Sequence, residues 1–240
     1  MAAPGSPAGM AAADQGVRAG MRLFVTSDLH GSPVLGEKLA SVLADIPVDA
    51  AVVCGDVTGQ HRTRTANELL QRQREDLQAL RALLASLPCP AWYILGNMDF
   101  IEAEPGDPYY LPFQQHPQLL AFELVNRTPF RSHREASFQR LQQELWKLEA
   151  GPHSIVVAHA PPFRAVDLTT GGQHAGSLAA RQYIERVQPL AWCCGHIHEA
   201  YGADVIGSTL VLNAACDPRR QRLRGFVLDT PGRTWEAIER

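Results

Sequence analysis

The chain has 240 residues, about 45% of them hydrophobic and 20% charged, and its formal net charge is −3. This length suits one large domain and is marginal for two, and the composition is that of an ordinary globular protein. Because basic residues are not in surplus and no apolar stretch is long enough to span a membrane, we expect neither nucleic acid nor a membrane as a partner. The sequence leaves the oligomeric state open.

Residues 1–20 are rich in Ala, Gly and Pro and lack the basic and apolar regions of a signal peptide. We therefore predict a disordered N-terminal tail followed by a single domain at 21–240. The chain has an odd number of cysteines, five, and no C-x-x-C pair. This usage favours reduced thiols and a cytoplasmic location over a disulfide framework.

The first half of the chain alternates short apolar runs with segments of helical periodicity. The runs at 21–27, 50–54 and 92–95 predict strands, and the segments 33–45 and 65–87 predict helices. Strands that are apolar throughout are usually buried on both faces and parallel. The pattern therefore predicts an α/β fold with parallel strands.

The second half is less regular. Residues 102–134 contain five prolines, and we predict irregular structure there around one strand at 119–125. Helices are predicted at 135–148 and 177–187, with Ser177 as the N-cap of the second. A glycine-rich loop, 171–176, precedes that helix. Further strands are predicted at 154–158, 190–194, 208–212, 225–228 and 234–238.

Five of the predicted strands end in polar clusters. Because sites in α/β sheets form beyond the carboxyl ends of the strands, these clusters are candidates for one common site. Each cluster is weak on its own, but all five occur in order along the chain. They are Asp28-x-His30, Gly55-Asp56, Gly96-Asn97-x-Asp99, His159 and Gly195-His196-x-His198.

These motifs resemble the signature of the calcineurin-like metallophosphoesterases, D-x-H, G-D, G-N, H and G-H-x-H, over roughly residues 21–228. The resemblance implies a four-layer α/β/β/α sandwich with two packed mixed sheets. It also implies two divalent cations as cofactors, with Asp56 shared between them. By the family's pattern the first cation would be held by Asp28, His30, Asp56 and His198, and the second by Asp56, Asn97, His159 and His196.

The implied activity is hydrolysis of a small phosphoester substrate. In this family two cations activate a hydroxide that attacks phosphorus in line, and Asn97 would also contact the phosphate. Carboxylate, imidazole and amide ligands suit Mn²⁺, which we expect, and also Fe²⁺, Zn²⁺ or Ni²⁺.

The sequence departs from the family's pattern at Met98. Many members carry a histidine there that protonates the leaving oxygen, supported by the acidic residue at the position of Asp99. A thioether cannot donate a proton, and general acid catalysis contributes about 10²–10⁴-fold. We therefore expect phosphodiesters to be favoured over phosphomonoesters, with a phosphomonoesterase as the alternative.

Other residues are candidates for the missing role. His174 lies in a G-x-H-x-G-S stretch similar to one in small bacterial and archaeal members, and we expect it to orient the substrate or donate the proton. Ser177 is expected to contact phosphate at the helix N-terminus, although both residues could equally form a plain helix cap. Asn213 could support the metal histidines or serve in a turn. A basic run at 219–224 could receive an anionic substrate or be a solvated turn.

A non-catalytic scaffold on the same fold is the rival function. All seven expected ligands are present, and carboxylates and imidazoles buried without cations would be unfavourable. The sequence therefore favours an enzyme. A nuclease would need a larger basic surface than this composition supplies.

Overall fold

The computed structural model describes residues 20–123 and 138–240. The predicted disordered tail lies outside the described residues, except for Gly20. The described helices and strands follow in this order: β1 Arg22–Thr26, α1 Pro33–Asp45, β2 Ala50–Cys54, α2 Ala66–Ser86, β3 Ala91–Ile94, η1 Leu111–Phe113, β4 Leu119–Phe122, α3 Phe138–Leu145, β5 Ile155–Ala158, α4 Leu178–Val187, β6 Ala191–Cys194, η2 His198–Ala200, β7 Gly202–Ile206, β8 Thr209–Asn213, β9 Arg224–Asp229 and β10 Thr234–Glu239.

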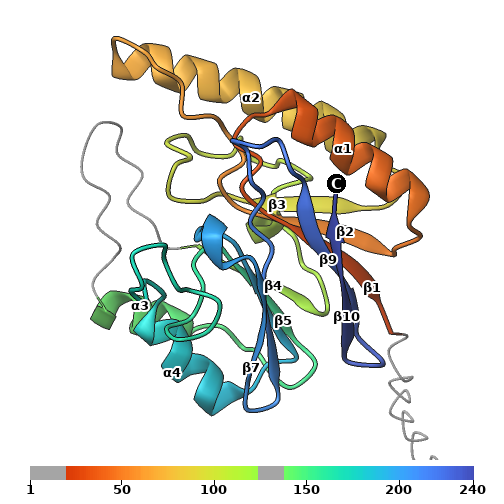
Figure 1. Ribbon diagram of the computed structural model, residues 1–240, viewed down its shortest axis with the longest axis vertical. Coiled ribbons are helices and arrows are strands. Elements are labelled where there is room, and N and C mark those ends of the chain that lie inside the picture. The colour runs from red at the N-terminus through yellow and green to blue at the C-terminus, as the bar shows by residue number, and fades with distance from the viewer. Residues whose placement is uncertain (1–19, 124–137) are drawn as a thin grey trace, which may run out of the picture.

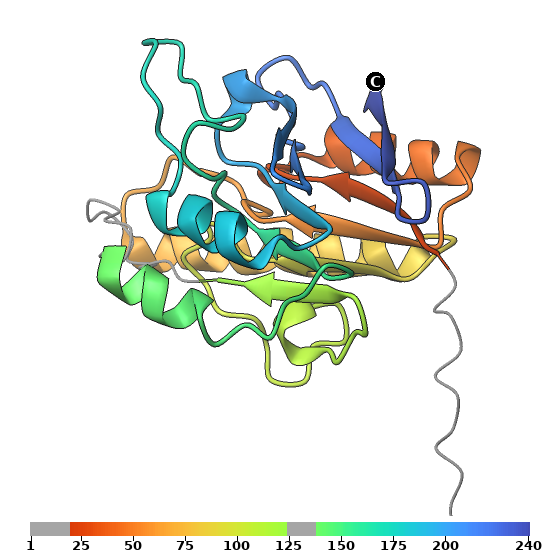
Figure 2. The same cartoon turned by 90° about the horizontal axis from the view of Figure 1, so that it is seen from below.

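The strands form two mixed sheets of five strands each. The first has the order β10-β9-β1-β2-β3, and the second has the order β4-β5-β6-β8-β7. Strands β1, β2 and β3 are parallel, as are β4, β5, β6 and β8, whereas β9, β10 and β7 pair antiparallel. Helices α1 and α2 cover the first sheet and α3 and α4 the second (Figures 1 and 2). The four-layer α/β/β/α sandwich predicted from the sequence is confirmed.

The apolar character of the central strands follows from this layering, because both faces of the sheets are covered there. In β1, Leu23 and Val25 point into the core between the two sheets, and Phe24 points toward α1 and α2. In β5, Val157 enters the same central core while Val156 packs under α4. Alternate residues therefore serve different cores, and the central positions of both strands are apolar.

Most predicted elements occur within a few residues of the predicted bounds, but β7 was not predicted. Ser177 is the N-cap of α4, as predicted, and Thr65 is the N-cap of α2. The predicted strand 119–125 and helix 135–148 extend outside the described residues. All five cysteines are free, and four of them are buried. Among the described helices, none has the length and apolarity to cross a membrane.

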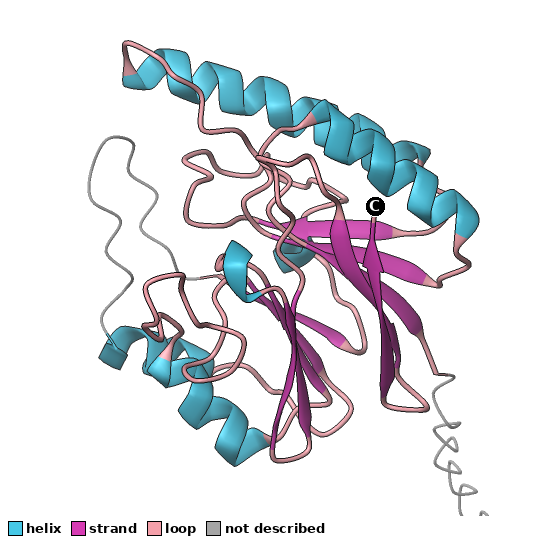
Figure 3. Cartoon of the chain, viewed as in Figure 1, coloured by secondary structure: helices cyan, strands magenta, loops and turns pink. Residues whose placement is uncertain are grey.

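The loops that follow β1, β2, β3, β5 and β6 gather at one end of the sandwich (Figure 3). Parallel strands bring their carboxyl ends to the same edge of a sheet, and here the two sheets face each other at that edge. All of the predicted ligands lie in or directly after these loops.

Candidate metal centre

A first group of predicted ligands joins the loop after β1 to the loop after β6. Asp28 Oδ1 lies 3.0 Å from His198 Nε2 and 3.8 Å from His30 Nε2, and the two imidazole nitrogens lie 3.4 Å apart. The potential ligand atoms of these three residues all lie within 4.8 Å of one another. This spacing is small enough for the three to surround one cation.

A second group joins the loops after β2, β3, β5 and β6. Potential ligand atoms of Asp56, His159 and His196 lie within 4.8 Å of one another. Asn97 belongs to the same group, because its Oδ1 lies 2.9 Å from His159 Nε2. The structure thus brings all seven predicted ligands together in two adjacent groups.

Asp56 lies between the two groups. Its Oδ1 accepts a hydrogen bond from the Met98 backbone N–H at 2.8 Å, which fixes the carboxylate. Its Oδ2 lies 3.9 Å from His30 Nε2 and 3.4 Å from His159 Nε2. One carboxylate oxygen therefore faces ligands of both groups, as a bridging ligand must.

The contacts of His159 test whether a cation fits. Its Nδ1–H donates to the Cys54 carbonyl oxygen at 2.8 Å, so a neutral ring has only a lone pair at Nε2. That nitrogen nevertheless faces Asn97 Oδ1 and Asp56 Oδ2, which are both acceptors. Buried acceptors directed at one another are unfavourable unless a proton or a cation lies between them. The mixed N and O donors suit a divalent transition metal.

The electrostatics of the site favour positive charge. Burial alone would lower the pKa of His159, but the neighbouring Asp56 and Asp28 carboxylates raise it to about 10. Burial would raise the pKa of Asp56, yet His159 holds it below its usual value. Burial lowers the pKa of His196 to about 4, and the charge of His159 adds to this effect. His196 is therefore neutral at pH 7 and has a lone pair for a cation.

The backbone of the site is strained. Nine described non-glycine residues have positive φ, and four of them are predicted ligands: Asp28, His30, Asp56 and His196, with φ between 48° and 72°. Such conformations are unfavourable for residues with a Cβ and cluster at functional sites. Four of the seven ligands that the motifs select therefore lie at strained backbone positions.

The glycines of the motifs are required by close approach. A Cβ at Gly96 would lie 2.2 Å from Asp56 Oδ1, and a Cβ at Gly195 would lie 2.2 Å from Asp28 Oδ2. Both distances are far below van der Waals contact. The glycine preceding Asn97 and the glycine preceding His196 therefore let the ligand loops of different strands pack together.

Asp99 contacts the backbone of the loops that carry the predicted ligands Asp56 and Asn97. Its side chain is fully buried, and its oxygens accept hydrogen bonds from the backbone N–H groups of Val57, Thr58 and Gly96 and from the Thr58 hydroxyl. Burial and the charge of Asp56 raise its pKa to about 6. Asp99 therefore clamps the loops after β2 and β3, and these contacts give it a positioning role.

Gln73 on α2 makes a second clamp that the sequence did not single out. Its Nε2 donates to the carbonyl oxygens of Gly59 and Met98, and its Oε1 accepts from the Phe100 backbone N–H. The side chain is fully buried. Helix α2 thus also fixes the loop that carries Asn97.

His174 pairs with Asp167, a buried residue that sequence reasoning missed. His174 Nδ1 lies 2.6 Å from Asp167 Oδ1, and Asp167 Oδ2 accepts from the backbone N–H groups of Arg164 and Gly176. The carboxylate therefore fixes the ring through Nδ1. Ser177 is buried, and its hydroxyl caps α4 by accepting from Ala180 N at 3.2 Å. The structure thus gives Ser177 the capping role, and its contact with phosphate stays a prediction.

Asn213 supports the histidine loop. Its Nδ2 donates to the carbonyl oxygens of Ile197 and Val166, and its Oδ1 accepts from the Ala215 N–H. Because Ile197 lies between His196 and His198, this buried amide fixes the segment that carries both imidazoles. Of its two predicted roles, the contacts match support of the ligand loop.

Residues 21–200 match the family model of the calcineurin-like phosphoesterases. The chain belongs to this family. Membership makes the chain a metallophosphoesterase, a metal-dependent hydrolase of phosphoesters, in agreement with the resemblance of its motifs.

Two proteins resemble the chain in sequence, and one solved structure resembles it in fold. MJ1162, an uncharacterised protein of Methanocaldococcus jannaschii, is 26% identical over 219 residues, which cover 88% of this chain and 92% of that protein. UPF0046 protein K07C11.7 of Caenorhabditis elegans is 31% identical over 93 residues, which cover 38% of this chain and 32% of that protein. The crystal structure of TT1561 from Thermus thermophilus has a TM-score of 0.62 at 16% identity, covering 92% of this chain and 99% of that chain.

Proposed function

We propose that this metallophosphoesterase binds two divalent cations, Mn²⁺ foremost, and favours phosphodiesters. The observation that carries the proposal is Asp56, whose Oδ2 faces ligand nitrogens of both groups. The first cation would be held by Asp28, His30, Asp56 and His198, and the second by Asp56, Asn97, His159 and His196.

When bound, the two cations supply Lewis-acid activation of a water nucleophile and neutralise the phosphoryl oxygens. The chain's own residues prepare for this. Asn97 directs its Oδ1 toward His159, and its amide nitrogen would donate to a phosphoryl oxygen. The Cys54 carbonyl and the Met98 N–H hold His159 and Asp56 in orientation.

The diester preference follows from the proton donor. The Met98 side chain cannot donate a proton to the leaving oxygen. An alkoxide that leaves from a phosphomonoester depends on such a proton more strongly than a more acidic leaving group does. We propose that His174, oriented by Asp167, donates that proton or orients the substrate through Nε2. The substrate would be a small phosphoester in the cytoplasm, where the five free cysteines stay reduced.

The test compares bis-p-nitrophenyl phosphate with p-nitrophenyl phosphate, using metal-stripped protein titrated with Mn²⁺. We expect metal-dependent turnover of the diester and much slower turnover of the monoester. Equal turnover of both would remove the diester preference and favour the phosphomonoesterase. No turnover with Mn²⁺, Fe²⁺, Zn²⁺ or Ni²⁺ would favour the non-catalytic scaffold.

A substitution at Met98 tests the role of the proton donor without changing a proposed metal ligand. With an alkyl phosphomonoester, whose alkoxide leaving group needs a proton, Met98→His should raise monoester turnover by about 10²-fold, at the lower end of what general acid catalysis contributes. Met98→Leu, which has similar volume and no proton, is the matched control and should leave the ratio of diester to monoester turnover unchanged. An unchanged ratio in Met98→His would contradict the explanation of the diester preference.

A further inference from the structure

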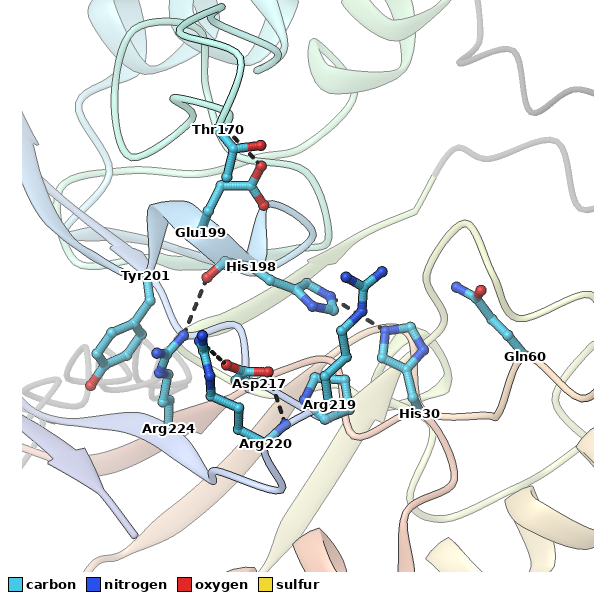
Figure 4. A pocket seen from close by; sticks show the side chains of 11 residues that line it. His30, Gln60, Thr170, His198, Glu199, Tyr201, Asp217, Arg219, Arg220 and Arg224 are labelled. Atoms are coloured by element: carbon cyan, nitrogen blue, oxygen red, sulfur yellow. Dashed lines mark hydrogen bonds and ion pairs between the residues drawn. The ribbon is translucent and has the colours of Figure 1, made fainter.

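A cavity of about 920 Å³ opens beside the first group of ligands (Figure 4). His30 and His198 line it together with three arginines, Arg219, Arg220 and Arg224. The three arginines belong to the end of the chain, in the turn before β9 and at its first residue. A substrate whose phosphorus lies at the metal ligands would therefore extend toward guanidinium groups.

Among the described residues, the charges that line the cavity leave one arginine without a partner. Arg220 pairs with Asp217 at 3.0 Å, and the other lining carboxylate, Glu199, accepts a hydrogen bond from the Thr170 backbone N–H. Arg219 has no hydrogen-bond or ion-pair partner among the residues that the structure describes. Its side chain lines the cavity together with His30 and His198 (Figure 4).

Arg224 is held in place and still has donor capacity. Its Nη1 donates to the His198 carbonyl oxygen at 3.3 Å, and its guanidinium lies over the Tyr201 ring. Its buried Nε has no hydrogen-bond partner in the described part of the chain, although Glu239 lies 3.8 Å away. Arg224 is thus a fixed group of the cavity lining, whereas Arg219 has no partner within residues 20–123 and 138–240.

We propose that this cavity binds a second phosphate of the substrate, with Arg219 as its main ligand. The inference rests on the proposed function and narrows its substrate class to phosphodiesters that carry a further phosphate group. Guanidinium groups present a planar set of donors that matches phosphate oxygens, and charge-assisted hydrogen bonds of this kind are strong.

The cavity is poorly suited to a stacked nucleobase. Tyr201 is its one aromatic residue besides the two histidines, and its ring already stacks with Phe226 at 5.1 Å and carries the Arg224 guanidinium at 5.0 Å. A base would have to displace these contacts. Recognition here is therefore by charge, and any nucleoside part of the substrate would serve as a spacer.

The experiment uses two chromogenic phosphodiesters that differ by one phosphate: the p-nitrophenyl ester of thymidine 5′-phosphate and the same ester with a 3′-phosphate. With Mn²⁺-loaded enzyme, kcat/KM should be about tenfold higher for the substrate with the extra phosphate, mainly through KM, because hydrogen bonds to charged groups contribute that much. Arg219→Ala should bring this ratio close to one.

Arg222→Ala is the matched control. Arg222 lies in the same turn and carries the same charge, but it pairs with Glu239 at 2.9 Å and does not line the cavity. Its removal should leave the ratio unchanged. A ratio near one in the wild-type enzyme would overturn the inference, and so would an equal loss of both activities in Arg219→Ala. An equal fall of the ratio in Arg222→Ala would show only a long-range effect of net charge and would also overturn it.

Binding measurements keep this test independent of turnover. By calorimetry, thymidine 3′,5′-bisphosphate should bind the Mn²⁺-loaded protein about tenfold more tightly than thymidine 5′-monophosphate, and Arg219→Ala should remove the difference. If neither ester is hydrolysed but this difference is present, the proposed function fails and the phosphate site stands. Equal binding of the two nucleotides refutes the phosphate site whatever the enzyme hydrolyses.

Discussion

Asp99 illustrates how a buried carboxylate acts on the metal centre through the backbone. Its four hydrogen bonds fix the segments that carry Asp56 and Asn97. In Asp99→Asn the new NH₂ group would face the N–H groups of Val57 and Gly96, which would then lack acceptors. We expect unfolding free energy to fall by about 2–4 kcal/mol, because each unsatisfied buried group costs about 1–3 kcal/mol.

The same variant should weaken Mn²⁺ binding by about 10–100-fold, the effect of losing a residue that orients ligands. Denaturant unfolding and calorimetric titration measure the two effects. Asp45→Asn, at an exposed position at the end of α1, is the control and should change neither. An Asp99→Asn protein with unchanged Mn²⁺ affinity would show that the clamp does not position the ligands.

His159 gives a prediction about protons. Its pKa of about 10 in the metal-free protein means that the ring is protonated at pH 8, whereas a ligand nitrogen must be neutral. Mn²⁺ binding at pH 8 should therefore release about one proton from this residue, and affinity should rise with pH below 10. Calorimetry in buffers of different ionisation enthalpy counts the proton. Binding enthalpies that do not depend on the buffer would contradict this account of the site.

The sequence reveals the ligands more readily than the residues that orient them. The seven ligands follow apolar runs in a fixed order, so position along the chain identifies them. Gln73 and Asp167 have no such local signal. Gln73 lies on a helix with many polar residues, and its three partners lie between 14 and 27 residues away. Only the packing of α2 against the loops makes it a buried clamp.

Among the structural elements, the turns after the strands are the most sensitive to added volume. Gly96→Ala would place a Cβ 2.2 Å from Asp56 Oδ1, so the bridging carboxylate or its loop must shift. We expect a loss of about 1–3 kcal/mol in stability, as for other overpacked sites. Diester turnover should fall in parallel, because the displaced group is a proposed ligand of both cations.

Gly151→Ala is the matched control for this substitution. Nothing lies within 4 Å of the position of its Cβ, and its φ is not positive. Its stability should stay within about 0.5 kcal/mol of wild type, as for ordinary surface changes. If Gly96→Ala bound Mn²⁺ and turned over the diester as well as Gly151→Ala does, the close packing of the loops would have no functional role.

The elements that the sequence predicts well are those with a strong hydrophobic signal. Helix α1 and strand β2 occur with the predicted bounds, because one has a clear amphipathic period and the other is buried along its whole length. Strand β7 at the edge of the second sheet was missed. Its residues are mostly half-buried or exposed, and only Ile206 is fully buried, so no alternation is visible in Gly202–Ile206. Its pairing with β8 exists only in the folded sheet.

At the scale of the whole molecule, the metal centre joins the two sheets. Asp28, Asp56 and Asn97 follow strands of the first sheet, whereas His159 and His196 follow strands of the second. Cations bound by both sets would cross-link the two halves of the sandwich at the end where the loops meet. Metal binding should therefore be coupled to global stability and not only to activity.

Removal of the metal tests this coupling. A ligand that binds only the folded state at a hundredfold excess over its Kd adds about 2.7 kcal/mol. For a chain of this size that corresponds to a rise in Tm of roughly 5–10 °C between EDTA-treated and Mn²⁺-loaded protein.

The rise should be largely lost in Asp56→Asn, which removes the charge shared by the two groups. It should be kept in His153→Ala, an exposed histidine that precedes β5, at the opposite end of that strand from His159. The same rise in Asp56→Asn as in wild type would mean that Mn²⁺ stabilises the protein from another site. A Tm that does not change with Mn²⁺ in the wild-type protein would mean that metal binding does not hold the two sheets together.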